Sequence, residues 1–336
     1  MPKILITGNG FDLNLGLPTH YNDFISILNY IVSNGKIDFD KIYSKSLNFD
    51  KIKKNFHSFD FDSEKIKLII EEVNSNLWFN FFKDELKIET WIDFENKIEY
   101  VINIIFSSIK NIQDEVFKKG SVQTLDSYGA SLFNKDIEII TVLKKFNIIS
   151  NNLLGNLVLN KEFLINKYNY YTNVNLEKIS KHLLTELNSF KNIFNQYFEL
   201  FVFPFYENVN KNIDEERYIS FDRHYTFNYT PTFEKIYGEN NITNFLHGKI
   251  DTNENKIVLG INEIPNNNID NRYFIPFTKY FQKLNNKTDY RFIQEYENNK
   301  NDRYAFFFLG HSMDRSDADY IHEVFDFIKK VIKTNL

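Results

Sequence analysis

The stretch GNGFDL, which starts at Gly8, combines residue types that could bind a nucleotide. It follows the apolar run Lys3–Thr7 and carries two glycines and an acid. Glycines let a backbone approach a phosphate closely, and the N–H groups that open the next helix attract its charge. The spacing is neither GxGxxG nor a P-loop. Asp12 lies inside the expected loop, where it would repel a phosphate, so we expect it either to face a ribose or a developing cation, or to cap a local turn.

Two polar residues follow strand-like runs in the last third of the chain. Asn228 lies in TFNYT, where its amide could orient a ribose hydroxyl or a water, or could close a turn after the strand. His247 ends the run NFLH and precedes Gly248. Histidine is the side chain best suited to proton transfer near neutral pH, although a structural histidine would fit the same position. For His224 and His311 the sequence does not decide between a functional and a structural role.

Two further stretches carry candidates. Gly310, Ser312 and Asp314 follow the apolar run YAFFFL, and small and polar groups at the end of a strand could meet an adenosine or its phosphates. In WIDFENKIEY, helical spacing places Glu95 on the same face as Trp91 and Ile98. A carboxylate on an apolar face is either paired with a buried Lys or Arg, or works in a cleft.

The elements that must position these residues follow from the apolar pattern. Residues 3–7 read as a buried strand, and the helical pattern after it begins near Thr19 and ends at Gly35. Strand-like runs return after residue 206, beginning at the following residues: Tyr218, His224, Ile242, Lys256 and Tyr304. Buried strands alternating with helices predict an α/β fold with a Rossmann-like parallel sheet. We expect this domain to comprise residues 1–37 and 207–336, interrupted by a long, mainly helical insertion over residues 38–206.

Composition excludes several classes of protein. The chain has 336 residues, no cysteine and a net charge of −5. Disulfides, zinc–thiolate sites and cysteine nucleophiles are therefore impossible, and the mixed charge argues against a nucleic-acid partner. We see no metal-ligand spacing, and we expect no metal. No signal peptide or membrane span is evident, so we expect a cytoplasmic protein without a membrane partner.

Taken in order, these stretches resemble the AbiH family of bacteriophage abortive-infection proteins. The resemblance rests on ILITGNGFDLNLGLPTHYNDF, WIDFE, TFNYTPTFEKIYG, NFLHGKI with IVLGINE, and FLGHSMDRSDADYI. They span the chain from Ile4 to Ile321, with a looser match between Phe106 and Ser220. The resemblance implies a role in anti-phage defence.

The family is in turn distantly similar to sirtuin-like NAD-binding domains. The matching positions are Gly8, Gly10, Gly16, Leu17, Pro18, Thr19, Asn228, His247, Gly248, Gly310 and Ser312. Two positions depart from the sirtuin-like pattern: Asp12 stands near a small residue of that pattern, and Thr230 replaces its aspartate. The four-cysteine zinc module of deacetylating sirtuins is missing, which argues against a deacetylase.

This second resemblance implies hydrolysis of NAD to nicotinamide and ADP-ribose. Asn228 would hold the ribose or a water, His247 would be the general base, and Asp12 or Glu95 would stabilise the developing cation. The residues expected to contact the dinucleotide are Gly8, Asn9, Gly10, Phe11, Pro18, Thr19, Gly248, Gly310, Ser312 and Asp314. The alternative is a sensor that binds NAD or ADP-ribose without cleaving it. A homo-oligomer, a phage-derived trigger and an associated defence protein are the further partners that we consider.

Overall fold

The computed structural model describes residues 2–35, 37–46, 48–55, 61–85, 91–119, 136–167, 170–207, 209, 221–238, 243–251, 256–265, 269–288, 304–313 and 318–334. The chain divides into two compact units. The first comprises Met1–Val73, Lys191–Leu259 and Gln282–Leu336, and the second comprises Asn74–Phe190 and Gly260–Phe281. The expected domain bounds at residues 37 and 206 stay a prediction. In the described ranges, no helix is both long and apolar enough to cross a membrane.

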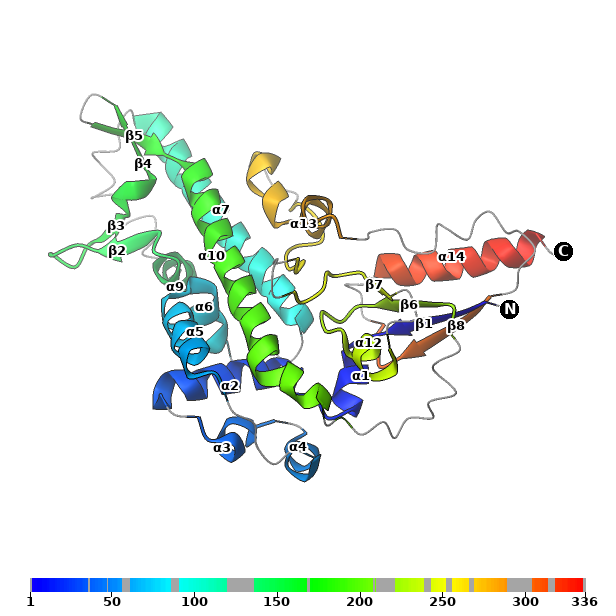
Figure 1. Cartoon of the computed structure of the whole chain (residues 1–336). Helices are drawn as coiled ribbons and strands as arrows, with labels where there is room; N and C mark the ends of the chain where they lie inside the picture. Colours follow the sequence, from blue (N-terminus) through cyan, green and yellow to red (C-terminus); the bar gives the residue numbers. More distant parts are fainter. Residues whose placement is uncertain are drawn as a thin grey trace. The chain divides into compact units, whose positions relative to one another are not determined.

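A four-stranded parallel sheet organises the first unit (Figure 1). Its strands are β1 (Lys3–Thr7), β6 (Arg223–Thr226), β7 (Thr243–Phe245) and β8 (Ala305–Leu309), in the spatial order β7-β6-β1-β8. In register, Ile4 of β1 lies beside Arg223 on one side and Phe306 on the other. The order of the strands reverses between β1 and β8, which is where open α/β sheets bind ligands.

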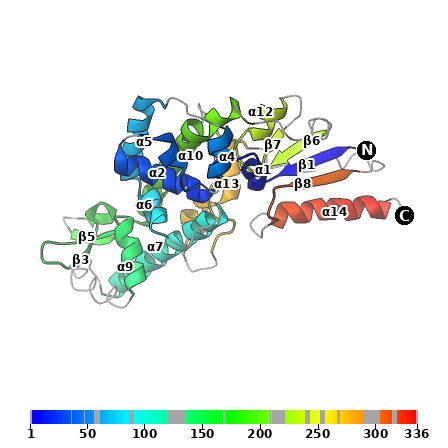
Figure 2. The ribbon, with the colours of Figure 1, turned by 90° about the horizontal axis from the view of Figure 1, so that it is seen from below.

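One face of this sheet is the apolar core of the unit. Every second residue of β1 and β6 points to it, so Ile4 and Ile6 pack with Tyr225 and Phe227. Helix α14 (Ala318–Thr334) covers this face and contributes Val324. Figures 1 and 2 both show α14 lying along the sheet. A helix after the last strand agrees with the expected alternation of buried strands and helices.

The opposite face of the sheet is polar near the carboxyl ends of its strands. The alternate residues of β1 and β6 are Thr7, His224 and Thr226, and all three are buried. The short helices α1 (Asn9–Asn14) and α12 (Thr232–Tyr237) close over them, with the ring of Phe233 centred 4.3 Å from that of His224. A helix thus begins at Asn9, and our placement of Asp12 in a loop is wrong.

Helix α2 (Tyr21–Asn34) follows α1 after a short turn. It begins one residue later than expected: His20, not Thr19, is the N-cap, and the side chains of His20 and Asp23 form a reciprocal capping box. Gly35 ends the helix with φ +60°, as its sequence position predicted. The other elements of this unit are α3 (Phe39–Tyr43), α4 (Phe49–Asn55), α5 (Ser63–Ser75), the end of α10 (Leu176–Tyr197), η3 (Phe198–Val202), η4 (Phe203–Glu207) and most of α13 (Lys279–Asn286).

The second unit is mainly helical and has an aromatic core. Its helices are α6 (Leu77–Lys83), α7 (Trp91–Lys119), α9 (Ile137–Lys145) and most of α10, and its short turns are η2 (Lys161–Phe163), η5 (Asn271–Tyr273) and η6 (Ile275–Phe277). Trp78 is fully buried, and its indole donates a hydrogen bond to the carbonyl of Leu183. Two antiparallel pairs that we had not predicted complete the unit, β2 (Ile149–Asn151) with β3 (Leu157–Leu159) and β4 (Leu164–Lys167) with β5 (Tyr170–Val174).

The apolar run at Lys256 is not a strand, which corrects our expectation. Val258 N–H donates to the backbone carbonyl of His247 at 2.9 Å, and Leu259 bonds to a side chain instead of to a neighbouring strand. The amide of Gln282 accepts from Leu259 N–H and donates to Leu259 C=O, both at 3.0 Å. Lys191 donates to the same Gln282 oxygen at 2.6 Å, and burial lowers the pKa of this lysine to about 7. The run at Tyr218 lies outside the described residues apart from Phe221.

Candidate functional site

The loops that follow β1 and β8 are joined by backbone hydrogen bonds. Gly8 N–H donates to Leu309 C=O at 3.2 Å, and Gly10 N–H donates to Gly310 C=O at 2.8 Å. A Cβ on Gly310 would lie 2.1 Å from Phe11 N, and a Cβ on Gly8 or Gly10 would lie 2.8 Å from Gly310 O. The chain therefore needs glycine here for its own packing, and the N–H groups of Gly8 and Gly10 are already engaged. Contact of these glycines with a pyrophosphate stays a prediction.

Asp12 and Asn228 come together beside these loops. The Asn228 amide donates to Gly8 C=O at 3.0 Å, and the Thr230 hydroxyl donates to Asp12. Asp12 is fully buried, and desolvation raises the pKa of its carboxyl group to about 7, although the hydrogen bond from Thr230 opposes this shift. Its Oδ1 atom has no hydrogen-bond partner among the described residues. This is an atom to which a ligand could donate a hydrogen bond.

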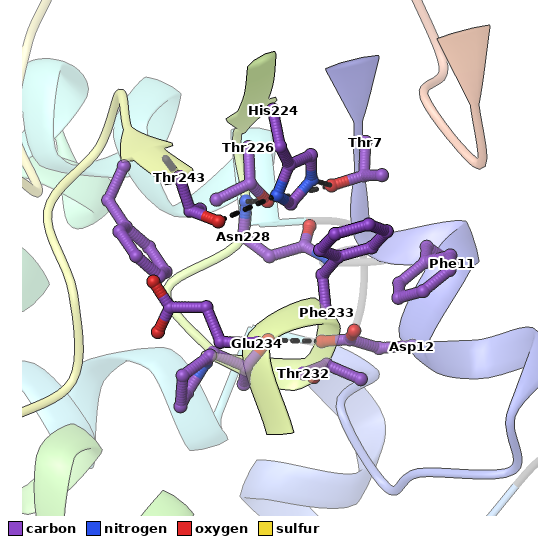
Figure 3. A pocket seen from close by; sticks show the side chains of 13 residues that line it. Thr7, Phe11, Asp12, His224, Thr226, Asn228, Thr232, Phe233, Glu234 and Thr243 are labelled. Atoms are coloured by element: carbon purple, nitrogen blue, oxygen red, sulfur yellow. Dashed lines mark hydrogen bonds between the residues drawn. The ribbon is translucent and has the colours of Figure 1, made fainter. Parts of the chain in front are cut away.

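A chain of hydroxyl groups runs through His224 (Figure 3). Thr7 Oγ1 donates to Thr226 Oγ1 at 2.9 Å, so its contact of 2.9 Å with His224 Nε2 has the imidazole N–H as donor. His224 Nδ1 then accepts from the Thr243 hydroxyl at 3.1 Å. Burial lowers the pKa of His224 to about 3, so the ring is neutral and one tautomer serves both bonds.

These two groups of polar residues line one recess beneath α12, drawn in Figure 3. The aromatic rings of Phe11, Phe233 and Phe245 also line it. The recess has about 180 Å³ of empty space, and none of that space is wide enough for a water molecule. A ligand would therefore have to move α12 or the side chains of the recess to enter it.

His247 does not line this recess. Its ring packs edge-on against Phe227, with 5.4 Å between the ring centres, and Phe227 belongs to the apolar face of the sheet. His311 contacts the same Phe227 ring at 4.2 Å, and Tyr320 lies 6.4 Å from His247. Lys283 donates a hydrogen bond to the Tyr320 hydroxyl. Asn228 and His247 thus belong to two different groups of side chains at the carboxyl edge of the sheet.

The other predicted residues are placed as follows. Asn9 donates its amide to Thr19 C=O at 3.1 Å, and Pro18 C=O accepts from the Tyr197 hydroxyl at 2.7 Å. Thr19 is buried, Ser312 is exposed, and Asp314 lies outside the described residues. Gly248 has φ +85°, and a Cβ there would lie 2.0 Å from Lys256 O. The left-handed φ angle and this close contact therefore require glycine at position 248 without any ligand, as the close contact does at Gly310.

Glu95 lies in the second unit, on α7. Its Oε2 is 2.6 Å from Lys279 Nζ, and both side chains are at most 10% exposed. This is the buried ion pair that we gave as one reading of Glu95. Its role in a reaction stays a prediction. Across the described residues, no three His, Asp or Glu side chains gather as a metal site would require.

Several residues of the site escaped the sequence reasoning. Lys283 and Tyr320 carry no local signal, since neither follows a strand. His224 and Thr226 did carry one, because they alternate with Asn228 along HYTFN and must share a face of the strand. That alternation predicts a polar face, which the sequence reasoning left undecided at His224.

The comparison with protein-family models decides the family. The model described as "Bacteriophage abortive infection AbiH" matches residues 4–335. The chain belongs to the AbiH family. AbiH membership assigns it a role in bacteriophage abortive infection and confirms the first of the two resemblances. No significant match was found among curated proteins or among solved structures, so the sirtuin-like resemblance stays a prediction.

Proposed function

We propose that this AbiH chain acts in abortive infection by hydrolysing NAD to nicotinamide and ADP-ribose at the carboxyl edge of its parallel sheet. The observation that carries the proposal is the convergence of Gly8, Asp12 and Asn228 beside the reversal of strand order. Strand orders of this kind bind dinucleotides at that reversal. The unpartnered Oδ1 of Asp12 is the group that a ribose hydroxyl would satisfy.

The reaction breaks the bond between the ribose C1′ and the nicotinamide nitrogen. The bonding electron pair leaves with nicotinamide, which is neutral, and positive charge develops on the ribose. The oxygen of a water then bonds to C1′, and His247 takes the proton that this water loses. An ionised Asp12 would stabilise the cation, and because its pKa is near 7 a developing positive charge nearby would favour ionisation.

Release of nicotinamide from NAD tests the proposal. The purified chain is incubated with NAD beside the variant His247→Ala and the matched control His322→Ala, whose histidine is exposed on α14. We expect His247→Ala to lower turnover by about 10²–10⁴ and the control to keep it. Equal turnover in all three proteins would refute the assigned base.

The second candidate is a sensor that binds NAD or ADP-ribose without cleaving it. It is favoured by one observation, namely that His247 packs on Phe227 while Asn228 is bonded to Gly8. The two side chains that hydrolysis needs are thus held by different partners. Binding of ADP-ribose, measured by calorimetry, without release of nicotinamide from NAD would favour this candidate over the hydrolase.

A further inference from the structure

The outward face of α2 is unusual for an exposed helix in this chain. A quarter of the chain is charged, yet the only charged residue of α2 is Asp23, which is buried in the capping box. The remaining polar residues of the helix recur at helical spacing and form a stripe of amides and hydroxyls: Asn22, Ser26, Asn29, Ser33 and Asn34. Exposed faces of helices usually carry Lys and Glu, so an uncharged hydrogen-bonding stripe calls for an explanation.

This stripe is one wall of an open groove between α2 and α3. The groove measures about 690 Å³, which is within the range of small-molecule sites. It lies wholly in the first unit, and none of its lining residues belongs to the recess beneath α12. The other wall contributes Lys41 and Lys45, and Tyr30 adds an aromatic ring. No Asp or Glu lines the groove, so its formal charge is positive in a chain whose net charge is −5.

The groups in the groove are available to a ligand. In the part of the chain that the structure describes, no hydrogen bond or ion pair is made by the side chains of Asn22, Asn29 or Lys45. Lys41 lies 3.4 Å from Asp38, but both side chains are exposed. Such a surface pair contributes little stability, so a phosphate can replace Asp38 at small cost. Two of the three serines are less free, since Ser26 and Ser44 already donate to backbone carbonyls.

We propose that this groove binds a nucleoside phosphate. The phosphate lies against Lys41 and Lys45, the base stacks on Tyr30, and the amides of Asn22 and Asn29 bond to the base or the sugar. Ammonium groups bind phosphate as point charges, and stacking on an aromatic ring tolerates any base. The same chemistry is offered by a free nucleotide and by the end of a single strand of RNA. The site is separate from the proposed NAD site and does not depend on it.

Calorimetry on the purified full chain at low salt tests the groove, with AMP, ATP and a uridine hexanucleotide as the probes. The decisive variant is Lys45→Glu, and its matched control is Lys329→Glu, which makes the same change of charge at an exposed lysine on α14. We expect Lys45→Glu to weaken binding by about tenfold or more, because it replaces an attraction with a repulsion. The control should stay within about twofold, because Lys329 does not line the groove.

Further measurements test the stacking on Tyr30 and distinguish a free nucleotide from a strand of RNA as the ligand. Tyr30→Phe keeps the ring and should keep the affinity, whereas Tyr30→Leu should lose it, with thermal unfolding showing whether each variant is folded. Tighter binding of the hexanucleotide than of AMP would identify a strand as the source, and equal binding a free nucleotide. The proposal is overturned if no probe binds or if both lysine variants weaken binding equally.

Discussion

The side-chain amide of Asn228 is bonded to the backbone carbonyl of Gly8, 220 residues earlier in the chain, at 3.0 Å. This bond ties the end of β6 to the start of the glycine loop, and both groups are buried. Asn228 therefore has a structural task, whatever it does for a ligand. Loss of activity in an Asn228 variant would not by itself identify a catalytic residue.

Asn228→Ala should lower the free energy of unfolding by about 0.5–1.5 kcal/mol. The substitution removes one of the two hydrogen bonds that the Gly8 carbonyl accepts, and the bond from Phe11 N–H at 2.9 Å remains. Urea denaturation measures the loss, with Asn22→Ala as the control because Asn22 is exposed. Equal stability of the Asn228 variant and the wild type would mean that water or another donor replaces the amide.

Gly310→Ala should be much more damaging than Gly35→Ala. Both glycines have left-handed φ angles, +64° and +60°, so an alanine costs each site about 1–2 kcal/mol of backbone strain. Only at Gly310 does the new Cβ collide with backbone, at 2.1 Å from Phe11 N, whereas nothing lies within 4 Å of it at Gly35. We expect a further loss of about 1–3 kcal/mol or more at Gly310. Similar melting temperatures for the two variants would contradict the close contact of the two loops.

Asp12→Asn should stabilise the protein in a pH-dependent way. The pKa of Asp12 rises from 3.8 to about 7 on folding, so between these values the unfolded state loses the proton while the folded state keeps it. Stability of the wild type then falls as pH rises through this window, by about 4 kcal/mol in total. Asparagine resembles the protonated acid and carries no such penalty.

The gain from Asp12→Asn should therefore be near zero at pH 4, grow to pH 7 and stay constant above it. Denaturation at pH 4.5, 6 and 8 measures the difference between variant and wild type. A difference that does not change with pH would show that Asp12 titrates normally in the folded protein.

The Glu95–Lys279 pair should show strong coupling in a double-mutant cycle. Removing one partner leaves the other as a buried, uncompensated charge, at a cost of about 3–5 kcal/mol. Replacing both, as Glu95→Leu with Lys279→Met, removes both charges and should cost far less than the sum. Single variants that each cost under about 1 kcal/mol would mean that water reaches the pair.

The sheet could be predicted from the sequence because its strands are short apolar runs that end in turns or glycine. Gly35 was predictable for the same reason, since a glycine after a helical pattern is a local signal. The glycines at 8, 10 and 310 are instead required by a contact between segments that are far apart in the sequence. Their pattern resembles a phosphate loop, but the contact that requires them lies between two loops 300 residues apart, and sequence spacing alone cannot show it.

The run at Lys256 misled the prediction for a related reason. Three of its residues, Ile257, Val258 and Leu259, are buried and apolar, as those of a strand would be, but Leu259 bonds to the side chain of Gln282 and Val258 N–H to the carbonyl of His247. Likewise, the grouping of His247 with Phe227 rather than with Asn228 depends on which face each side chain takes after its strand has ended. Alternation predicts faces only within a strand.

The position of β1 in the sheet has a consequence for the synthesis of the protein. This strand is synthesised before both of its neighbours in the sheet, β6 and β8, which begin at Arg223 and Ala305. At about 5–20 residues per second, a ribosome needs on the order of ten seconds or more after β1 to reach β6. Throughout that time the nascent chain carries the apolar segment KILIT with no sheet to join. We expect a chaperone that recognises short apolar segments to bind β1 while the chain is still on the ribosome.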